Sequence, residues 1–192
     1  TAALSDYLEI YPDRINEVKN LIAQKKLYIG PYYCSTDSFL VDRESLIRNL
    51  QFGIKYSQDF GCKDYIAYHA DTFGHSKDMP KIVNYFNIEH GIFWRGCGKL
   101  PSEFNFNGLK STYLVEGYFH DELSQDVSCE QKAVGLKRTL DRISEYSSDY
   151  ILLPLGADHL CAADNIKEQL MEINKHLDEY DIILLSLIHI SE

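Results

Sequence analysis

Short apolar runs recur along this 192-residue chain and alternate with stretches of helical periodicity. The runs are DYIAY (64–68), GIFW (91–94), YILLPLG (150–156) and DIILL (181–185). Short apolar runs bounded by turn-forming residues are typical of buried strands. Strands that alternate with helices form mostly parallel sheets or barrels, so the sequence predicts an α/β fold.

Helices are predicted between these runs wherever apolar residues recur every three or four positions. The predicted helices cover 12–27, 43–60, 79–86, 130–146 and 164–180. Asp42 is suited to cap the second of them, and Gly61 to end it. The segment SEFNFNGLKSTYLVEGYF (102–119) alternates around Asn107-Gly108, which predicts a β-hairpin inserted into the sheet or barrel.

Charge and cysteine usage exclude some classes of protein. The net charge is −10, and no Lys/Arg cluster is present, which argues against nucleic acids and membranes as partners. The five cysteines are odd in number, widely spaced and without a CxxC pair, which favours a reducing compartment such as the cytoplasm. No signal peptide or spanning segment is visible. Because the first residue is not Met, we expect a longer parent sequence.

Polar residues follow three of the predicted strands. Asp71 comes after 64–68, Arg95 directly after 91–94, and Asp158-His159 after 150–156. In parallel sheets and barrels, ligands bind beyond the carboxyl ends of the strands. The sequence therefore predicts that Asp71, Arg95 and Asp158 converge on one site.

Asp71 lies in YHADTFGHSKDMP (68–80) and has two interpretations. It is either a turn former between strand and helix, or an active-site carboxylate acting as glycosidase nucleophile or metal ligand. Its neighbours favour the second interpretation. Phe73 offers a face on which a sugar can stack, Gly74 allows a tight turn, and His75 is a candidate supporting partner.

Asp158 and Arg95 have similar alternatives. Asp158 either starts a helix or supplies the second carboxylate that glycoside hydrolysis needs, which retaining enzymes hold about 5 to 5.5 Å from the first. Arg95 either packs its stem beside Trp94 or binds an anion or a sugar hydroxyl. The chain has no HxH, HExxH, glycine-rich phosphate loop or GxSxG, so nucleotide binding and serine hydrolase chemistry have no support.

Several segments together resemble glycoside hydrolase family 38, the zinc-dependent α-mannosidases, and most nearly its intracellular bacterial type. They are YIGPYYCSTDSFLVDRESLIRNL, DTFGHSKDMPKIV, FWRG and LLPLGADHL, within a likeness from about Asp6 to Tyr180. The resemblance implies a retaining, exo-acting α-mannosidase with a seven-stranded β/α barrel. It also implies one Zn²⁺ per catalytic domain, and terminal α-mannosyl residues of oligosaccharides or small conjugates as substrate.

The family's residue roles carry over onto matching positions. Asp71 matches the nucleophile, which is also a zinc ligand, and Asp158 matches the acid/base candidate. Phe73 and Arg95 match substrate-binding positions, and Asp37 matches an acidic position to which we assign no role. The family's other zinc ligands, an H-x-D motif on the preceding strand and a histidine well downstream, have no counterpart here.

The resemblance therefore implies that residues 1–184 are a fragment of the catalytic barrel, inactive alone, whose parent protein could be homo-oligomeric. The last residues, LSLIHISE (185–192), do not continue the family pattern and resemble the translation of a sequencing-library adapter, so we expect a non-native tail. Two alternatives stay open. One is another metal-dependent barrel hydrolase such as a deacetylase, whose H-x-x-x-H pair is missing, and the other is a degenerate carbohydrate-binding paralogue.

Overall fold

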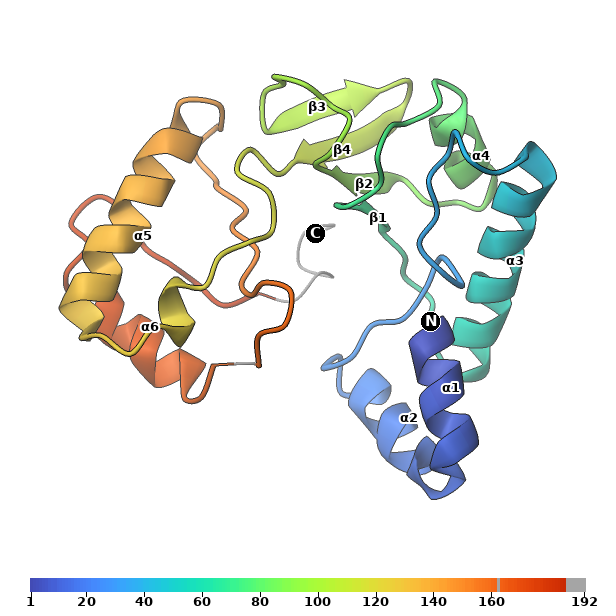
Figure 1. Cartoon of the computed structure of the whole chain (residues 1–192), viewed down its shortest axis with the longest axis horizontal. Coiled ribbons are helices and arrows are strands. Elements are labelled where there is room, and N and C mark those ends of the chain that lie inside the picture. The colour runs from blue at the N-terminus through green and yellow to red at the C-terminus, as the bar shows by residue number, and fades with distance from the viewer. Residues whose placement is uncertain (162, 186–192) are drawn as a thin grey trace. The chain divides into compact units, whose positions relative to one another are not determined.

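The computed structural model describes residues 1–161 and 163–185 (Figure 1). Within them the chain divides into two compact units. The first unit comprises residues 1–97 and 105–111, and the second comprises 98–104 and 112–185. Each unit is described by itself below.

The first unit contains most of the helices. They are α1 (Ala2–Ile10), the 3₁₀ turn η1 (Pro12–Arg14), α2 (Ile15–Ala23), α3 (Arg43–Asp59) and α4 (Met79–Tyr85). The prediction that Asp42 caps α3 is confirmed, because its carboxylate accepts the backbone N–H of Ser45 at 2.7 Å. Helix α1 was not predicted. Its Leu4 and Leu8 pack against Val18 and Ile22 of α2, which explains why it forms.

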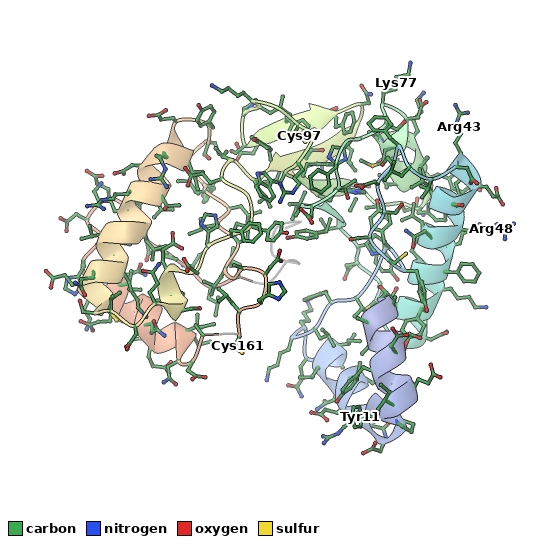
Figure 2. All side chains as sticks on the ribbon, in the orientation of Figure 1. Tyr11, Arg43, Arg48, Lys77, Cys97 and Cys161 are labelled. Atoms are coloured by element: carbon green, nitrogen blue, oxygen red, sulfur yellow. The ribbon has the colours of Figure 1, made fainter. Side chains whose placement is uncertain are left out.

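Helix α3 shows how helical periodicity separates a buried face from a solvent face. Leu46 and Leu50 are buried on its inner side. Arg43 and Arg48 point away from the ribbon into solvent, where Arg48 pairs with Glu44 one turn earlier (Figure 2). The predicted amphipathic helix is therefore confirmed here.

The sheet has four strands in the order β1-β2-β4-β3. Strands β1 (Ala67–His69) and β2 (His90–Phe93) are parallel, with His69 opposite Phe93. Strands β3 (Glu103–Phe106) and β4 (Leu109–Tyr113) form the predicted hairpin. Its turn, Asn107-Gly108, has φ values of 48° and 95°, the left-handed pair that a tight hairpin requires. The α/β class is confirmed, whereas the seven-stranded barrel is not, since the described residues form a four-stranded mixed sheet.

The second unit is built on two helices with a shared core. Helix α5 (Cys129–Ser144) begins with a capping box between Ser128 and Gln131, and α6 (Ile166–Asn174) packs against it. The buried core side chains are Leu123, Ala133, Leu136, Leu170, Ile173 and Leu177. Both helices were predicted, although α6 ends before the predicted boundary at 180.

Two predicted strands are wrong. Residues 150–156 form no strand, and Pro154 lacks the N–H that a ladder would use; only Gly156 makes an isolated bridge, to His120. Residues 181–185 form none either, and the Asn174 side chain bonds both the N–H (3.0 Å) and the C=O (2.9 Å) of Ile182. In both segments the apolar composition is that of a strand, but no strand ladder forms.

Three further predictions concern the whole chain. Within the described part, no helix is both long and apolar enough to cross a membrane. All five cysteines are free thiols, and Cys161 is exposed (Figure 2). The predicted non-native tail (185–192) lies, apart from Leu185, outside the described residues and stays a prediction.

Candidate active site

The register of β1 and β2 brings two of the predicted site residues together. The strands end at the paired residues His69 and Phe93, and Asp71 and Arg95 each follow two positions later. The N–H of Arg95 donates to the carbonyl of Ala70 at 3.3 Å, so the two segments stay adjacent beyond the ladder. Of the three residues predicted to converge, Asp71 and Arg95 therefore lie together beyond the carboxyl ends of β1 and β2.

Asp71 and Arg95 form an ion pair in which Nε of Arg95 donates to Oδ1 of Asp71. The Arg95 guanidinium also lies 4.7 Å from the ring centroid of Phe73 and 4.2 Å from that of Trp94. These contacts orient the guanidinium through attraction to both aromatic faces. Arg95 does lie beside Trp94, but it is the guanidinium and not the aliphatic stem that faces the ring, and the alternative role in substrate binding stays a prediction.

The loop that follows Asp71 is held by Asp37, for which the sequence suggested no role. The carboxylate of Asp37 accepts the backbone N–H of Phe73 at 2.7 Å. The Phe73 side chain itself is 60% exposed. Asp37 therefore fixes the backbone of a residue whose ring faces solvent, which is the arrangement that stacking of a sugar on Phe73 would need.

A buried aromatic layer supports this end of the sheet. His69 stacks on Phe93 with ring centroids 5.3 Å apart and planes 8° apart, and a 2.6 Å hydrogen bond joins its Nε2 to the Tyr32 hydroxyl. Burial lowers the pKa of His69 to about 3 and raises that of Tyr32, so both are neutral near pH 7. The base of the site is thus a neutral, hydrogen-bonded layer rather than a source of charge.

His75, the candidate supporting partner of Asp71, bonds to the loop after β2, and its support of Asp71 stays a prediction. Its Nε2–H donates to the carbonyl oxygen of Arg95 at 2.8 Å, and its ring lies edge-on to Phe93 at 4.9 Å. Burial lowers the pKa of His75, while the hydrogen bond to Arg95 opposes that shift. His75 therefore joins the loop after β1 to the loop after β2.

Two glycines let these loops touch. Gly74 and Gly96 have φ values of 105° and 76°, in the left-handed region that favours glycine. A Cβ at Gly96 would lie 2.6 Å from the backbone nitrogen of Gly74, closer than a non-bonded contact allows. The two backbones approach each other because Gly96 carries no side chain, whereas the missing side chain at Gly74 leaves room for the ring of Phe39.

Gly96→Ala is expected to lower the free energy of unfolding by about 3 kcal/mol, combining left-handed strain with backbone overlap. Gly98→Ala is the matched control. Gly98 has a φ of 66°, but a Cβ there meets nothing within 4 Å, so only the strain of about 1 to 2 kcal/mol is expected. Urea unfolding of both variants measures the difference, and equal losses would show that the close approach is unimportant.

The described residues do not form a zinc site by themselves. Zinc sites in proteins use three or four His, Cys, Asp or Glu ligands. No group of three or more such residues is placed to hold a metal ion in the described part of the chain. Asp71 as a zinc ligand therefore stays a prediction that requires ligands from elsewhere.

Asp158 belongs to the second unit. It is exposed on a turn that follows Gly156, and the next residue, His159, has a left-handed φ of 65°. The predicted pairing of Asp158 with Asp71 stays a prediction.

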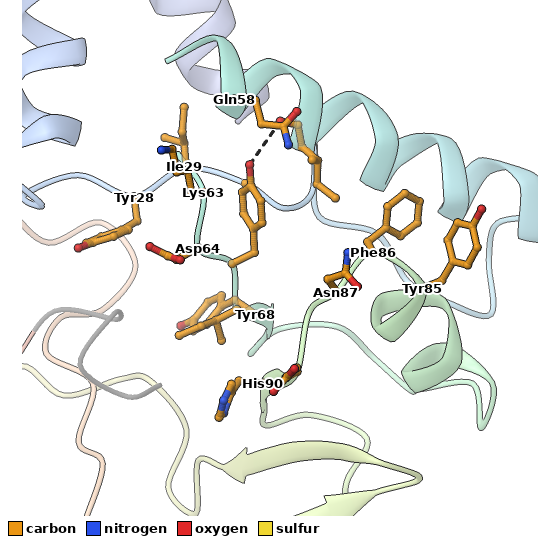
Figure 3. Close-up of a pocket in the computed structure, with 15 residues that line it drawn as sticks. Tyr28, Ile29, Gln58, Lys63, Asp64, Tyr68, Tyr85, Phe86, Asn87 and His90 are labelled. Atoms are coloured by element: carbon orange, nitrogen blue, oxygen red, sulfur yellow. Dashed lines mark hydrogen bonds between the residues drawn. The ribbon is translucent and has the colours of Figure 1, made fainter. Parts of the chain in front are cut away.

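A separate cavity of about 570 Å³ lies in the first unit (Figure 3). Its lining includes Tyr65 and Ile66, which precede β1, and Glu89 and His90 at the start of β2. These are the amino ends of the two strands, whereas Asp71 and Arg95 follow the carboxyl ends. The cavity therefore contains none of the predicted site residues.

Comparison with known proteins gives consistent results. The chain is 40% identical over 106 residues to a protein of Halalkalibacterium halodurans that carries the provisional name mannosylglycerate hydrolase. It is 28% identical over 135 residues to an α-mannosidase of Saccharomyces cerevisiae. These matches cover 55% and 60% of this chain, and 12% of each relative.

A solved structure of an α-mannosidase from Enterococcus faecalis V583 matches 98% of this chain with a TM-score of 0.87 and 26% identity. The match covers 23% of that longer chain. The model of the glycosyl hydrolases family 38 N-terminal domain matches residues 1–188. The chain therefore belongs to glycoside hydrolase family 38 and corresponds to part of its N-terminal domain.

Proposed function

We propose that the full-length protein containing this chain is a retaining α-mannosidase that removes terminal α-mannosyl residues. The observation that carries the proposal is the placement of Asp71 and Arg95 at matched ends of two parallel strands, beside the exposed ring of Phe73. Family membership supports the reaction class. The name of the Halalkalibacterium relative supports a small mannosyl conjugate as substrate, and that of the Saccharomyces relative supports an α-mannoside; terminal residues of oligosaccharides stay part of the proposal.

In the proposed reaction the Asp71 carboxylate attacks the anomeric carbon and forms a covalent glycosyl-enzyme ester. The bond from that carbon to the leaving oxygen breaks, and protonated Asp158 donates its proton to this oxygen. Water then attacks the anomeric carbon while Asp158 takes a proton from it, which releases mannose and frees Asp71. Two inversions at the same carbon give net retention.

The chain's own residues have further proposed roles. Phe73 stacks on the sugar ring, and Arg95 binds a sugar hydroxyl while it orients the Asp71 carboxylate. We further propose that the sheet is part of a β/α barrel, that Asp71 is one ligand of a Zn²⁺ whose other ligands lie outside this chain, and that the protein acts in the cytoplasm. The free thiol state of all five cysteines is compatible with that reducing compartment.

Proton NMR of a reaction between the full-length protein and an aryl α-mannoside tests the proposal. The α-anomer of mannose is expected to appear first and then to mutarotate. Initial formation of the β-anomer would contradict retention. Release of acetate from acetylated glycans would instead favour a deacetylase, and sugar binding without turnover would favour a degenerate paralogue.

A further inference from the structure

The turn that carries Asp158 is attached to a neighbouring segment of the second unit. The N–H of His120 donates to the carbonyl of Gly156 at 2.8 Å, and the N–H of Gly156 donates back to the carbonyl of His120 at 2.9 Å. Gly156 stands two residues before Asp158. Because Asp158 is exposed, its position depends on the backbone that this bridge holds.

The His120 side chain enters a buried polar cluster. Only 4% of His120 is exposed, and its Nδ1 lies 3.8 Å from Oε1 of Glu122. In the described part of the chain, Nε2 of His120 and Oε2 of Glu122 are buried without a hydrogen-bond partner. His120 lowers the pKa of Glu122, while burial opposes that shift, so Glu122 is charged near pH 7. Unpaired buried atoms are costly, so a cluster of this kind needs an explanation.

The cluster is tied to helix α5. Oε1 of Glu122 accepts the hydroxyl of Thr139 at 3.2 Å, and Arg142 donates to the same hydroxyl at 3.2 Å. Arg142 also makes a two-bond ion pair with Glu116, at 2.5 and 2.8 Å. A continuous set of contacts thus runs from α5 through Glu122 to His120 and on to Gly156.

We propose that His120 and Glu122 are positioning residues that hold the Asp158 turn in its catalytic geometry. The inference rests on the proposed function, in which Asp158 is the general acid and base. A general acid must lie within hydrogen-bond reach of the leaving oxygen, and a displacement of about 1 Å can cost roughly 100-fold in rate. The bridge at Gly156 connects the backbone next to the exposed Asp158 to His120, and through Glu122 to helix α5. This connection fixes the position of the Asp158 turn.

Leaving-group dependence distinguishes positioning of the acid from a merely structural role. A methyl α-mannoside needs protonation of its leaving oxygen, whereas a dinitrophenyl α-mannoside departs without it. In the full-length protein, His120→Ala and Glu122→Ala are each expected to lower kcat/KM for the methyl substrate by roughly 10- to 100-fold. For the dinitrophenyl substrate the expected loss is less than about threefold. The double variant should be no worse than either single variant, because the two residues act as a unit.

Ile173→Val is the matched control for lost packing in the same unit. Ile173 is fully buried in the α5–α6 core, and this change costs about 1 kcal/mol without touching the cluster. Any loss in the control should be equal for both substrates, with thermal unfolding recorded for every variant. The inference would be overturned if the His120 and Glu122 variants lost kcat/KM equally for both substrates. It would also be overturned if Ile173→Val, at the same stability, showed the same loss for the methyl substrate.

Asp158→Ala, assayed in parallel, separates this inference from the proposed function. If Asp158→Ala lowers kcat/KM selectively for the methyl substrate, and His120→Ala and Glu122→Ala do not, then only the positioning role is wrong. If Asp158→Ala shows no leaving-group dependence, the acid/base assignment is wrong, and the positioning role fails with it.

Discussion

Asp71→Asn in the full-length protein is expected to lower kcat for an aryl α-mannoside by roughly 10⁴-fold or more, because the proposed reaction uses Asp71 as nucleophile and its removal eliminates the covalent route. Loss of folding would not explain this result. The Asp71–Arg95 pair is partly exposed, and breaking such a pair costs at most about 1 kcal/mol. Activity and thermal unfolding should be measured together.

Asp78→Asn is the control for this change. Asp78 lies a few residues further along the same segment, and its carboxylate forms a surface ion pair with Lys81 at 3.2 Å. Its replacement should leave kcat within about twofold, since surface substitutions away from a site have small effects. If Asp71→Asn retained activity comparable to that of Asp78→Asn, Asp71 could not be the nucleophile.

Asp158→Ala is expected to lower kcat/KM for a poor leaving group by roughly 10²- to 10⁴-fold, the usual contribution of a general acid. For an activated aryl substrate the first step should persist and the glycosyl-enzyme should accumulate, because the base for the second step is missing. Added azide needs no base, so it should restore turnover and give a mannosyl azide of retained configuration.

Asp149→Ala controls for the loss of an exposed carboxylate from the same stretch of the second unit. It should behave as the unmodified protein with both substrates and should not respond to azide. An Asp158→Ala protein without azide rescue and with equal losses for all leaving groups would count against the acid/base role.

The meeting of Asp71 and Arg95 was predictable because parallel pairing is regular. When two consecutive strands are parallel neighbours, residues at the same distance past their ends lie close together. Here His69 pairs with Phe93, so Asp71 and Arg95, each two residues later, are neighbours. Helices α3 and α5 were predictable for a related reason. Their capping residues and apolar faces are encoded within the helices' own sequence, and both are found in the folded chain.

Features that depend on distant partners were not predictable. The bonds from Asp37 to Phe73 and from Tyr32 to His69 join residues 36 and 37 positions apart, and no local pattern records them. The runs 150–156 and 181–185 have strand composition, but a strand also needs a paired neighbour along its length. The described residues supply only the single bridge from Gly156 to His120. Helix α1 was missed because packing against α2 stabilises it.

The contact between Gly74 and Gly96 has a mechanical consequence. A side chain at position 96 would collide with the backbone of Gly74, and the His75 bond to Arg95 crosses the same junction. The nucleophile candidate and its cationic partner therefore belong to one closely joined piece, held by their ion pair, the Arg95–Ala70 backbone bond and the His75 bond. A change of substrate preference is better sought in segments that approach this piece from outside, such as the exposed Phe39–Val41 stretch, than in the piece itself.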